Sequence, residues 1–175
     1  VTGDTKVVEK GNADGLFINT SGIGIVSQYY NPCKAEPEDE IIITGGIGEH
    51  GTSILLDRYE FDIEADIESD CAPMCSLISC IGENLKYVKM MKDPTRGGLA
   101  TALNEIALTQ SLDIELSGNN IPIKNEVQAI NDILGIDPMY LACEGRMIII
   151  VKSYAIIKKH KLSVNLHQEL MELCI

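Results

Sequence analysis

The amino-acid sequence predicts an α+β fold for a domain that spans residues 39–175. Short runs of apolar residues, typical of buried strands, alternate with longer stretches whose apolar residues recur at helical spacing. The connections between these stretches are short and contain glycine, proline or asparagine. Hydrophobic residues make up 45% of the 175 residues, which is enough for a core, and neither repeats nor low-complexity tracts interrupt the pattern.

In the first half of this domain, Glu40–Thr44 is predicted to form a buried strand that ends at the glycine-rich turn Gly45–Gly48. A short helix is expected near His50–Asp57, followed by a solvated strand or loop at Phe61–Ser69. Asp70 has the residue type of a helix N-cap, and a proline follows in the first turn. The apolar residues expected on one face of that second helix are Met74, Leu77, Ile78 and Ile81.

In the second half, Lys86–Met91 is predicted to be a strand, and Asp93–Gly98 then opens a helix. The apolar residues at helical spacing in that helix are Leu99, Leu103, Ile106 and Ala107. Arg146–Val151 has the strongest strand pattern of the chain. The other expected elements are a strand at Ile114–Leu116, a helix at Glu126–Leu134 stopped by Gly135, and a mostly helical stretch at Tyr154–Leu173.

Residues 1–28 are too few to bury a core alone, and we expect them to be the last hairpin of an N-terminal domain. Its strands are predicted at Lys6–Glu9 and Leu16–Ile18. Residues 29–38 combine Asn31-Pro32 and Pro37 with little apolar periodicity, which predicts a linker. Because the sequence begins at Val1, inside a strand-like run, it reads as a fragment of a longer protein.

Composition excludes several classes of function. The chain has 14 basic and 26 acidic residues, a formal net charge of -12, and no cluster of lysine and arginine. Phosphate backbones would be repelled, so nucleic acid is not an expected partner. No run approaches the roughly 18 apolar residues of a membrane span. Six cysteines are too few for a disulfide scaffold, so we expect reduced thiols and a cytoplasmic location.

Two glycine-containing motifs have residues suited to phosphate or metal chemistry. In Gly3–Lys6, Asp4 has the chemistry to hold Mg²⁺, and Lys6 has the chemistry to neutralise a phosphate or move a proton. The alternative is a polar turn leading into an edge strand. The glycines of Gly45–Gly51 would let backbone N–H groups approach an anion, but their spacing fits no nucleotide fingerprint, and a tight structural turn is the favoured interpretation.

Two further motifs carry charged side chains at the ends of predicted elements. Asp93–Gly98 places Thr95 and Arg96 at the positive end of a helix, where a phosphate or carboxylate binds well. The alternative is a helix cap with glycines for close packing. In Cys143–Arg146, the carboxylate of Glu144 precedes a buried strand and would act as a general base once desolvated. A surface turn with an ion pair is the simpler interpretation of that motif.

The cysteines do not predict a metal site. Cys71, Cys75 and Cys80 lack a nearby histidine and do not have the spacing of a zinc knuckle. We expect them to be core or half-buried thiols. Cys174 is either a mobile nucleophile or an apolar contact on the last helix turn.

An ordered set of motifs covers about residues 1–152. The runs are Thr2–Val8, Phe17–Gly24, Gly48–Gly51, Ser69–Pro73, Asp93–Ala100, Asn104–Ala107 and Glu144–Arg146. Together they resemble the HypE family of hydrogenase maturation proteins, within the superfamily of aminoimidazole ribonucleotide synthetase and selenophosphate synthetase. This resemblance implies the C-terminal domain of the synthetase-like fold, a mixed sheet with helices packed on one face.

The resemblance also implies an activity. Proteins of this family use ATP to dehydrate a thiocarboxamide on their C-terminal cysteine to a thiocyanate, which supplies cyanide ligands for [NiFe]-hydrogenase. By the motif match, Lys6 and Glu144 would remove protons. Asp4 and Thr5 would lie beside the nucleotide phosphates, with Mg²⁺ at Asp4. Thr95 and Arg96 would bind near the interdomain cleft.

The resemblance implies partners too: other maturation proteins, namely a carbamoyltransferase and an iron-site scaffold, and a second copy of the complete protein. Two departures from the family pattern stand out. The N-terminal half that carries most of the ATP site is absent, and Cys174 is not in the Pro-Arg-Ile-Cys context of the family's C-terminus. We therefore expect an incomplete, inactive fragment and assign no nucleophile role to Cys174. The alternatives are a non-catalytic docking or oligomerisation module and another ATP-dependent enzyme of the superfamily.

Overall fold

The computed structural model describes residue 11 and residues 23–59 and 65–153. The predicted strands at Lys6–Glu9 and Leu16–Ile18 and the predicted helix at Tyr154–Leu173 lie outside these residues. So do four residues singled out from the sequence: Asp4, Thr5, Lys6 and Cys174. Within the described ranges, no helix is long and apolar enough to cross a membrane.

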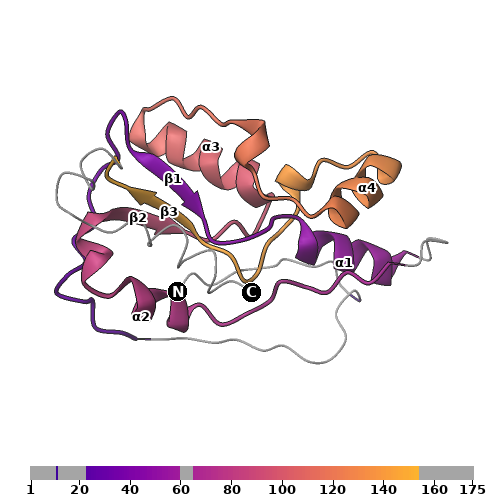
Figure 1. Ribbon diagram of the computed structural model, residues 1–175, viewed down its shortest axis with the longest axis horizontal. Helices are drawn as coiled ribbons and strands as arrows, with labels where there is room; N and C mark the ends of the chain where they lie inside the picture. The colour runs from indigo at the N-terminus through magenta and orange to yellow at the C-terminus, as the bar shows by residue number, and fades with distance from the viewer. Residues whose placement is uncertain (1–10, 12–22, 60–64, 154–175) are drawn as a thin grey trace.

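The described part of the chain is built around a three-stranded sheet (Figure 1). Its strands are β1 (Glu40–Ile43), β2 (Val88–Lys92) and β3 (Ile148–Val151), in the order β1-β3-β2. β3 pairs antiparallel with both neighbours, so Val151 lies opposite Glu40 on one side and Val88 on the other. A mixed sheet was expected, but every pairing among the described strands is antiparallel.

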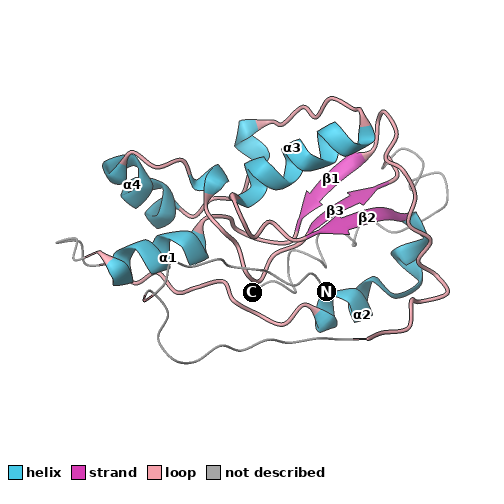
Figure 2. Cartoon of the chain, turned by 180° about the vertical axis from the view of Figure 1, so that it is seen from behind, coloured by secondary structure: helices cyan, strands magenta, loops and turns pink. Residues whose placement is uncertain are grey.

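Helices cover both faces of this sheet rather than the one face expected (Figure 2). All four residues of β3 are buried, and alternate side chains point to opposite faces. Ile148 and Ile150 belong to one apolar cluster, with Leu99, Leu103 and Ile106 of α3 (Gly98–Gln110). Ile149 and Val151 belong to a second, with Leu77 and Ile81 of α2 (Cys75–Ile81) and Leu85 of the 3-10 helix η1 (Gly82–Tyr87). Because β3 carries apolar side chains on both faces, helices have to pack on both faces to shield them from water.

Two further helices pack against each other beside the sheet (Figure 1). These are α1 (Glu49–Arg58) and α4 (Asn125–Leu134), and two short 3-10 turns, η2 (Gly118–Asn120) and η3 (Pro138–Tyr140), flank α4. Buried polar side chains join α1 to α4: Asn131 donates a 2.7 Å hydrogen bond to the Thr52 hydroxyl. Thr52 in turn donates to the carbonyl of Gly48, so its buried hydroxyl group both accepts and donates a hydrogen bond.

Most predicted elements are confirmed, and the differences have local causes. The second helix begins at Cys75, with Met74 in the N-cap position, so the prediction that Asp70 caps it is wrong. Residues 114–116 form no strand; Ile114 instead packs its side chain against the α3 face of the core from a loop. The thiols of α2 and of the segment before it were expected to be core or half-buried, but Cys71, Cys75 and Cys80 are exposed.

A buried lysine joins the predicted linker to the sheet. Lys89 lies on β2 with only 2% of its side chain exposed, and its ammonium group pairs with Glu36 at 2.5 Å and Asp39 at 2.8 Å. The N–H of Cys33 also bonds to the carbonyl of Lys89 at 3.0 Å. Residues 33–39 therefore contact the sheet directly. The domain boundaries at 1–28, 29–38 and 39–175 remain predictions.

The pKa shifts of Lys89 and Glu36 show that the charged forms of these two groups are the ones that pair. Burial alone would lower the pKa of Lys89, but hydrogen bonds and the negative charges of Asp39 and Glu36 outweigh it, so the pKa is raised above 10.5. The hydrogen bond and charge of Lys89 lower the pKa of Glu36 below 4.5. The pairing of Lys89 with Glu36 therefore contributes fully to stability between pH 4.5 and pH 10.5, the ordinary pKa values of the two groups. It is lost as the pH falls through the lowered pKa of Glu36 or rises through the raised pKa of Lys89.

We expect Asp39→Asn to lower the free energy of unfolding by about 2 kcal/mol, because it leaves a buried ammonium group with one exposed carboxylate partner. The matched control is Glu38→Gln, which removes an exposed carboxylate one residue away. Urea denaturation at pH 7 measures both variants. Equal losses in the two variants would contradict the role assigned to Lys89.

Candidate functional site

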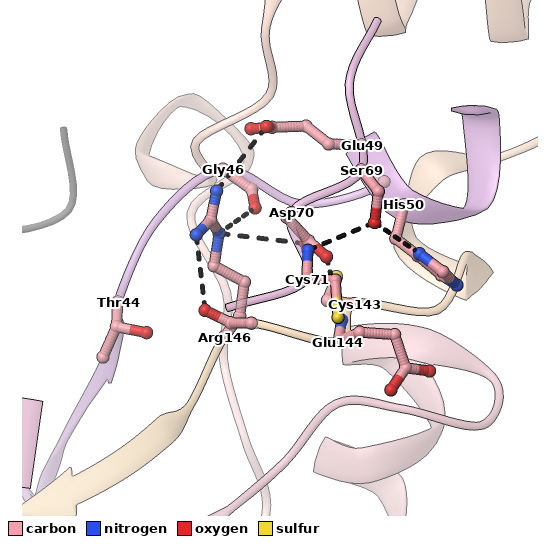
Figure 3. A network of polar contacts seen from close by, with 12 residues as sticks. Thr44, Gly46, Glu49, His50, Ser69, Asp70, Cys71, Cys143, Glu144 and Arg146 are labelled. Carbon is pink, nitrogen blue, oxygen red and sulfur yellow. Dashed lines mark hydrogen bonds and ion pairs between the residues drawn. The ribbon is translucent and has the colours of Figure 1, made fainter. Parts of the chain in front are cut away.

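Arg146 lies where three distant segments of the chain meet (Figure 3). Its side chain is 13% exposed and stands two residues before β3. The Nε group donates to the carbonyl of Gly46 at 3.0 Å. A terminal nitrogen pairs with Glu49 at 3.5 Å, and Nε lies 3.9 Å from a carboxylate oxygen of Asp70. One guanidinium group therefore balances two buried carboxylates.

The glycine-rich turn before α1 has a structural role, as the sequence favoured. The N–H of Ile47 bonds to the carbonyl of Pro122 at 2.9 Å, and the carbonyl of Gly46 accepts from Arg146. Glu49, the first residue of α1, is 4% exposed and also pairs with Lys124 at 3.0 Å. The positive end of the helix stabilises its negative charge. These backbone groups are thus engaged within the protein.

Asp70 is tied to the turn that carries Glu144. One carboxylate oxygen of Asp70 accepts the backbone N–H of Glu144 at 2.9 Å. The next residue, Gly145, packs against the same backbone: a side-chain carbon there would overlap the Asp70 carbonyl oxygen and lie 2.8 Å from the nitrogen of Ala72. Only glycine fits at that position. Figure 3 shows the Glu144 carboxylate directed away from Arg146.

The Asp93–Gly98 motif opens α3 and contacts the Glu144 turn. Thr95 donates its hydroxyl hydrogen to Asp93 at 3.1 Å. The N–H of Cys143 donates to the carbonyl of Pro94 at 3.0 Å, which fixes the two motifs side by side. Gly98 has a φ of +62°, and a side-chain carbon there would lie 2.5 Å from the carbonyl oxygen of Leu141. The second glycine of the motif is therefore required by close packing, as one of the two interpretations proposed.

A groove of about 700 Å³ runs between these two motifs. Three residues singled out from the sequence line it together: Thr95, Arg96 and Glu144. Arg96 and Glu144 are exposed and Thr95 is half-buried. The desolvation that a general base needs is thus not supplied to Glu144 by the described residues. The other lining residues are Tyr30, Met74, Ile78, Met91, Lys92, Asp93, Ala102, Glu105, Arg146 and Met147.

The sequence did not identify Glu49 and Asp70 as members of this site. Asp70 resembled a helix cap because a proline and an apolar stripe follow it, and that local signal concealed its distant partner. Glu49 appeared only as part of a glycine-rich turn. The family resemblance did contain a signal for both residues, because the runs Gly48–Gly51 and Ser69–Pro73 are among those that match.

The described residues hold no group of three or more His, Cys, Asp or Glu side chains placed for a metal ion. The predicted Mg²⁺ ligand, Asp4, lies outside them, so its role stays a prediction. For a phosphate, the described residues offer the guanidinium group of Arg96, a suitable donor for an anion, on the groove. The Thr95 hydroxyl on the same groove donates its hydrogen to Asp93 and would have to leave that bond to donate to an anion.

Cys143, next to Glu144, is not a reactive thiol. It is fully buried, and burial raises its pKa to about 11. Its thiol lies 3.7 Å from the carbonyl oxygen of Leu141. At neutral pH Cys143 is therefore a protonated core residue.

Comparison with known proteins agrees with this architecture. Residues 36–155 match the model of the AIR synthase related protein C-terminal domain, and the chain belongs to that family. Within it, the curated relatives are hydrogenase maturation proteins. The chain is 44% identical to a candidate hydrogenase expression/formation protein of Methanocaldococcus jannaschii, over 94% of this chain and 51% of that protein. It is 41% identical to the carbamoyl dehydratase HypE of Rhodobacter capsulatus, over 86% of this chain and 45% of that protein.

Solved structures show the same relationship. The chain resembles HypE in the crystal structure of a HypE–HypF complex, with a TM-score of 0.70 and 31% identity, covering 80% of this chain and 43% of that one. It also resembles the hydrogenase maturation protein HypE in complex with ATP, with a TM-score of 0.65 and 36% identity, covering 70% of this chain and 37% of that one. The chain spans about half the length of the curated relatives it matches.

We expect Gly145→Ala to destabilise the protein by about 2–3 kcal/mol, because the added methyl group overlaps the backbone of Asp70. Gly118→Ala is the matched control, since nothing lies within 4 Å of a side-chain carbon at that position. Thermal unfolding followed by circular dichroism measures both. A Gly145→Ala protein as stable as the control would show that the two segments do not touch.

The exposure of the thiols predicts their order of alkylation. With iodoacetamide at pH 8, Cys33, Cys71, Cys75 and Cys80 should react readily because they are exposed. Cys143 should stay unmodified until the protein is unfolded, because it is buried and its pKa is about 11. Peptide mapping by mass spectrometry separates these sites. Alkylation of Cys143 at the rate of Cys75 would contradict the described core.

Proposed function

We propose that this chain contributes the C-terminal part of a HypE-type carbamoyl dehydratase, an ATP-dependent enzyme of hydrogenase maturation. The observation that carries the proposal is the groove that brings Thr95, Arg96 and Glu144 together. The curated relatives named carbamoyl dehydratase HypE support it, as does the solved HypE bound to ATP. The activity belongs to the complete protein, and this chain alone is expected to be inactive.

The proposed reaction converts a thiocarboxamide on a cysteine sulfur to a thiocyanate. The amide oxygen is a poor leaving group, so the γ-phosphoryl group of ATP is first transferred to it and ADP leaves. The nitrogen then loses two protons, the carbon–oxygen bond breaks, and phosphate departs as the carbon–nitrogen triple bond forms. The reaction therefore needs groups that accept protons near the nitrogen and positive charge near the phosphate.

We assign proton removal to Glu144 and Lys6. The Glu144 carboxylate is exposed on the groove, and within the described ranges it forms no ion pair that would lower its basicity. Closure of the groove by substrate or by the rest of the protein would supply the desolvation that the described residues lack. Lys6 lies outside the described residues, so its assignment rests on the motif resemblance alone.

We assign phosphate binding to the residues that open α3. The guanidinium group of Arg96 would pair with phosphate oxygens, and the Asp93 carboxylate holds the Thr95 hydroxyl in place. Asp4 and Thr5 would lie beside the nucleotide, with Mg²⁺ held by Asp4. When bound, Mg²⁺ neutralises phosphate charge during transfer. The assignments of Asp4 and Thr5 rest on the resemblance.

The proposed partners are other maturation proteins. A HypE is solved in complex with HypF, and a similar complex with a carbamoyltransferase would deliver the carboxamide group. A homodimer of the complete protein and an iron-site scaffold that accepts the cyano group complete the proposal. We also propose a cytoplasmic location with reduced thiols; the described cysteines are free.

A second candidate function is a non-catalytic docking module for these partners. The solved HypE–HypF complex and the net charge of -12 favour it, since charge steers association. The discriminating experiment is binding of the isolated 175-residue chain to a carbamoyltransferase partner at low salt, without ATP. Failure to bind would exclude the docking module and leave the dehydratase proposal intact.

The dehydratase proposal is tested by grafting residues 1–152 into the matching region of the R. capsulatus carbamoyl dehydratase, which is 41% identical. We expect this chimera to form thiocyanate on its cysteine, detected by mass spectrometry as a loss of water from the carboxamide. Glu144→Gln and Lys6→Ala should each lower the rate by at least about 100-fold, because each removes a proton acceptor. Glu83→Gln, a change at an exposed carboxylate away from the groove lining, is the control.

Thiocyanate formation at the full rate in the Glu144→Gln chimera would overturn the assignment of the base. A folded chimera with no activity at all would overturn the proposed function.

A further inference from the structure

Asp70 is a buried charge that the proposed chemistry does not use. Its side chain is fully buried, although it stands in a segment, residues 65–74, without helix or strand. A carboxylate removed from water is destabilising unless charged or hydrogen-bonding partners compensate it. The partners of Asp70 therefore indicate what this buried charge does.

Each oxygen of Asp70 has a separate partner on the same turn. Oδ1 accepts the backbone N–H of Glu144 at 2.9 Å. Oδ2 makes no hydrogen bond and faces the Nε of Arg146 at 3.9 Å. The positive charge of Arg146 thus lies beside one oxygen of Asp70, while the other oxygen holds the backbone of Glu144.

Close packing reinforces that hold. Gly145 lies so close to the main chain of Asp70 and Ala72 that no side chain fits. Three consecutive residues, 144 to 146, therefore each touch Asp70 through a different group: an N–H, a bare α-carbon and a guanidinium. Because the backbone is fixed at three successive residues, the Glu144 carboxylate can move only by rotation about its own side-chain bonds.

The Asp70 segment is itself anchored to α1. The Ser69 hydroxyl oxygen accepts the N–H of Cys71 at 3.1 Å and lies 2.8 Å from Nδ1 of His50 (Figure 3). His50 belongs to the first turn of α1, beside Glu49, which also contacts Arg146. Ser69 and Cys71, on either side of Asp70, are thus held by hydrogen bonds that do not involve Glu144.

We propose that Asp70 is a positioning residue that fixes the backbone of Glu144 and so aims the Glu144 carboxylate into the groove beside Thr95 and Arg96. The inference rests on the proposed function, in which Glu144 accepts a proton from the substrate nitrogen. Proton transfer requires the carboxylate oxygen of Glu144 and the substrate nitrogen to lie within about 2.6–3.2 Å of each other. If the turn that carries Glu144 is loose, only a fraction of bound substrate molecules meets this condition. Asp70 would raise that fraction without touching substrate.

The first test uses the 175-residue chain and amide hydrogen exchange. Asp70→Ala should speed exchange of the Glu144 amide by about 10-fold or more relative to that of Cys143, whose bond to Pro94 is unchanged. Asp70→Asn keeps an oxygen that accepts the N–H, so protection should stay within about threefold of the original chain. Asp66→Ala and Asp66→Asn, at an exposed carboxylate in the same segment, are the matched controls.

The second test measures thiocyanate formation by the chimera described above. Asp70→Ala should lower kcat by about 10- to 100-fold and leave the KM for ATP within about twofold, because only the aim of the base changes. Asp70→Asn should restore most of the lost kcat. A merely structural role would lower the apparent kcat only in proportion to the folded fraction, so kcat is expressed per folded molecule as counted by circular dichroism. On that basis a merely structural Asp70 would leave kcat unchanged in Asp70→Ala.

Three results would overturn the inference: unchanged exchange at Glu144 in Asp70→Ala, equal loss of protection in Asp70→Asn, or an unchanged kcat in Asp70→Ala where Glu144→Gln is inactive. A fully active Glu144→Gln chimera has a different meaning. It would remove the proposed role of Glu144 itself, whatever the exchange experiment shows, so the two failures are distinguishable.

Discussion

The arrangement of this site depends on the charge of Arg146. Its guanidinium group meets a backbone carbonyl at Gly46 and two buried carboxylates, Glu49 and Asp70. Each carboxylate has an oxygen without a hydrogen bond, and the positive charge of Arg146, with Lys124 beside Glu49, compensates the cost of burying them. The planar guanidinium group spreads its donors over three nitrogen atoms in a fixed fork, whereas the three N–H groups of a lysine ammonium share one nitrogen atom. The groove wall is therefore an electrostatic assembly as much as a packed one.

The sheet sets the position of that charge. Arg146 stands two residues before β3, and β3 is buried on both faces between α3 on one side and α2 with η1 on the other. A slip of one residue would exchange Ile148 and Ile150 with Ile149 and Val151 between the two faces and would break both hydrogen bonds between Thr44 and Met147 beside the strand, so these contacts fix the register. The same register places Glu144 beside the segment that opens α3, through the bond from Cys143 to Pro94. Core packing and site geometry are thus parts of one constraint.

Features that depend on neighbouring residues could be predicted from the sequence, and features that join distant residues could not. Leu99, Leu103 and Ile106 are buried as their spacing predicts, and the strand at 146–151 is confirmed as β3. The groove residues Thr95, Arg96 and Glu144 were identified from their motifs. Asp70 was misassigned because its partner lies 74 residues away, beyond any local pattern. The exposure of Cys75 and Cys80 likewise depends on which side of α2 faces the sheet.

The strand order has a consequence for biosynthesis. Among the strands that the structure describes, β1 and β2 do not pair with each other, and each pairs only with β3, whose residues follow β1 by about a hundred positions. A ribosome adds roughly 5–20 residues per second, so both outer strands wait several seconds with unpaired edges before their shared neighbour emerges. During that interval the apolar run Ile41–Ile43 and the apolar side chains of Val88, Met90 and Met91 are natural binding sites for a chaperone.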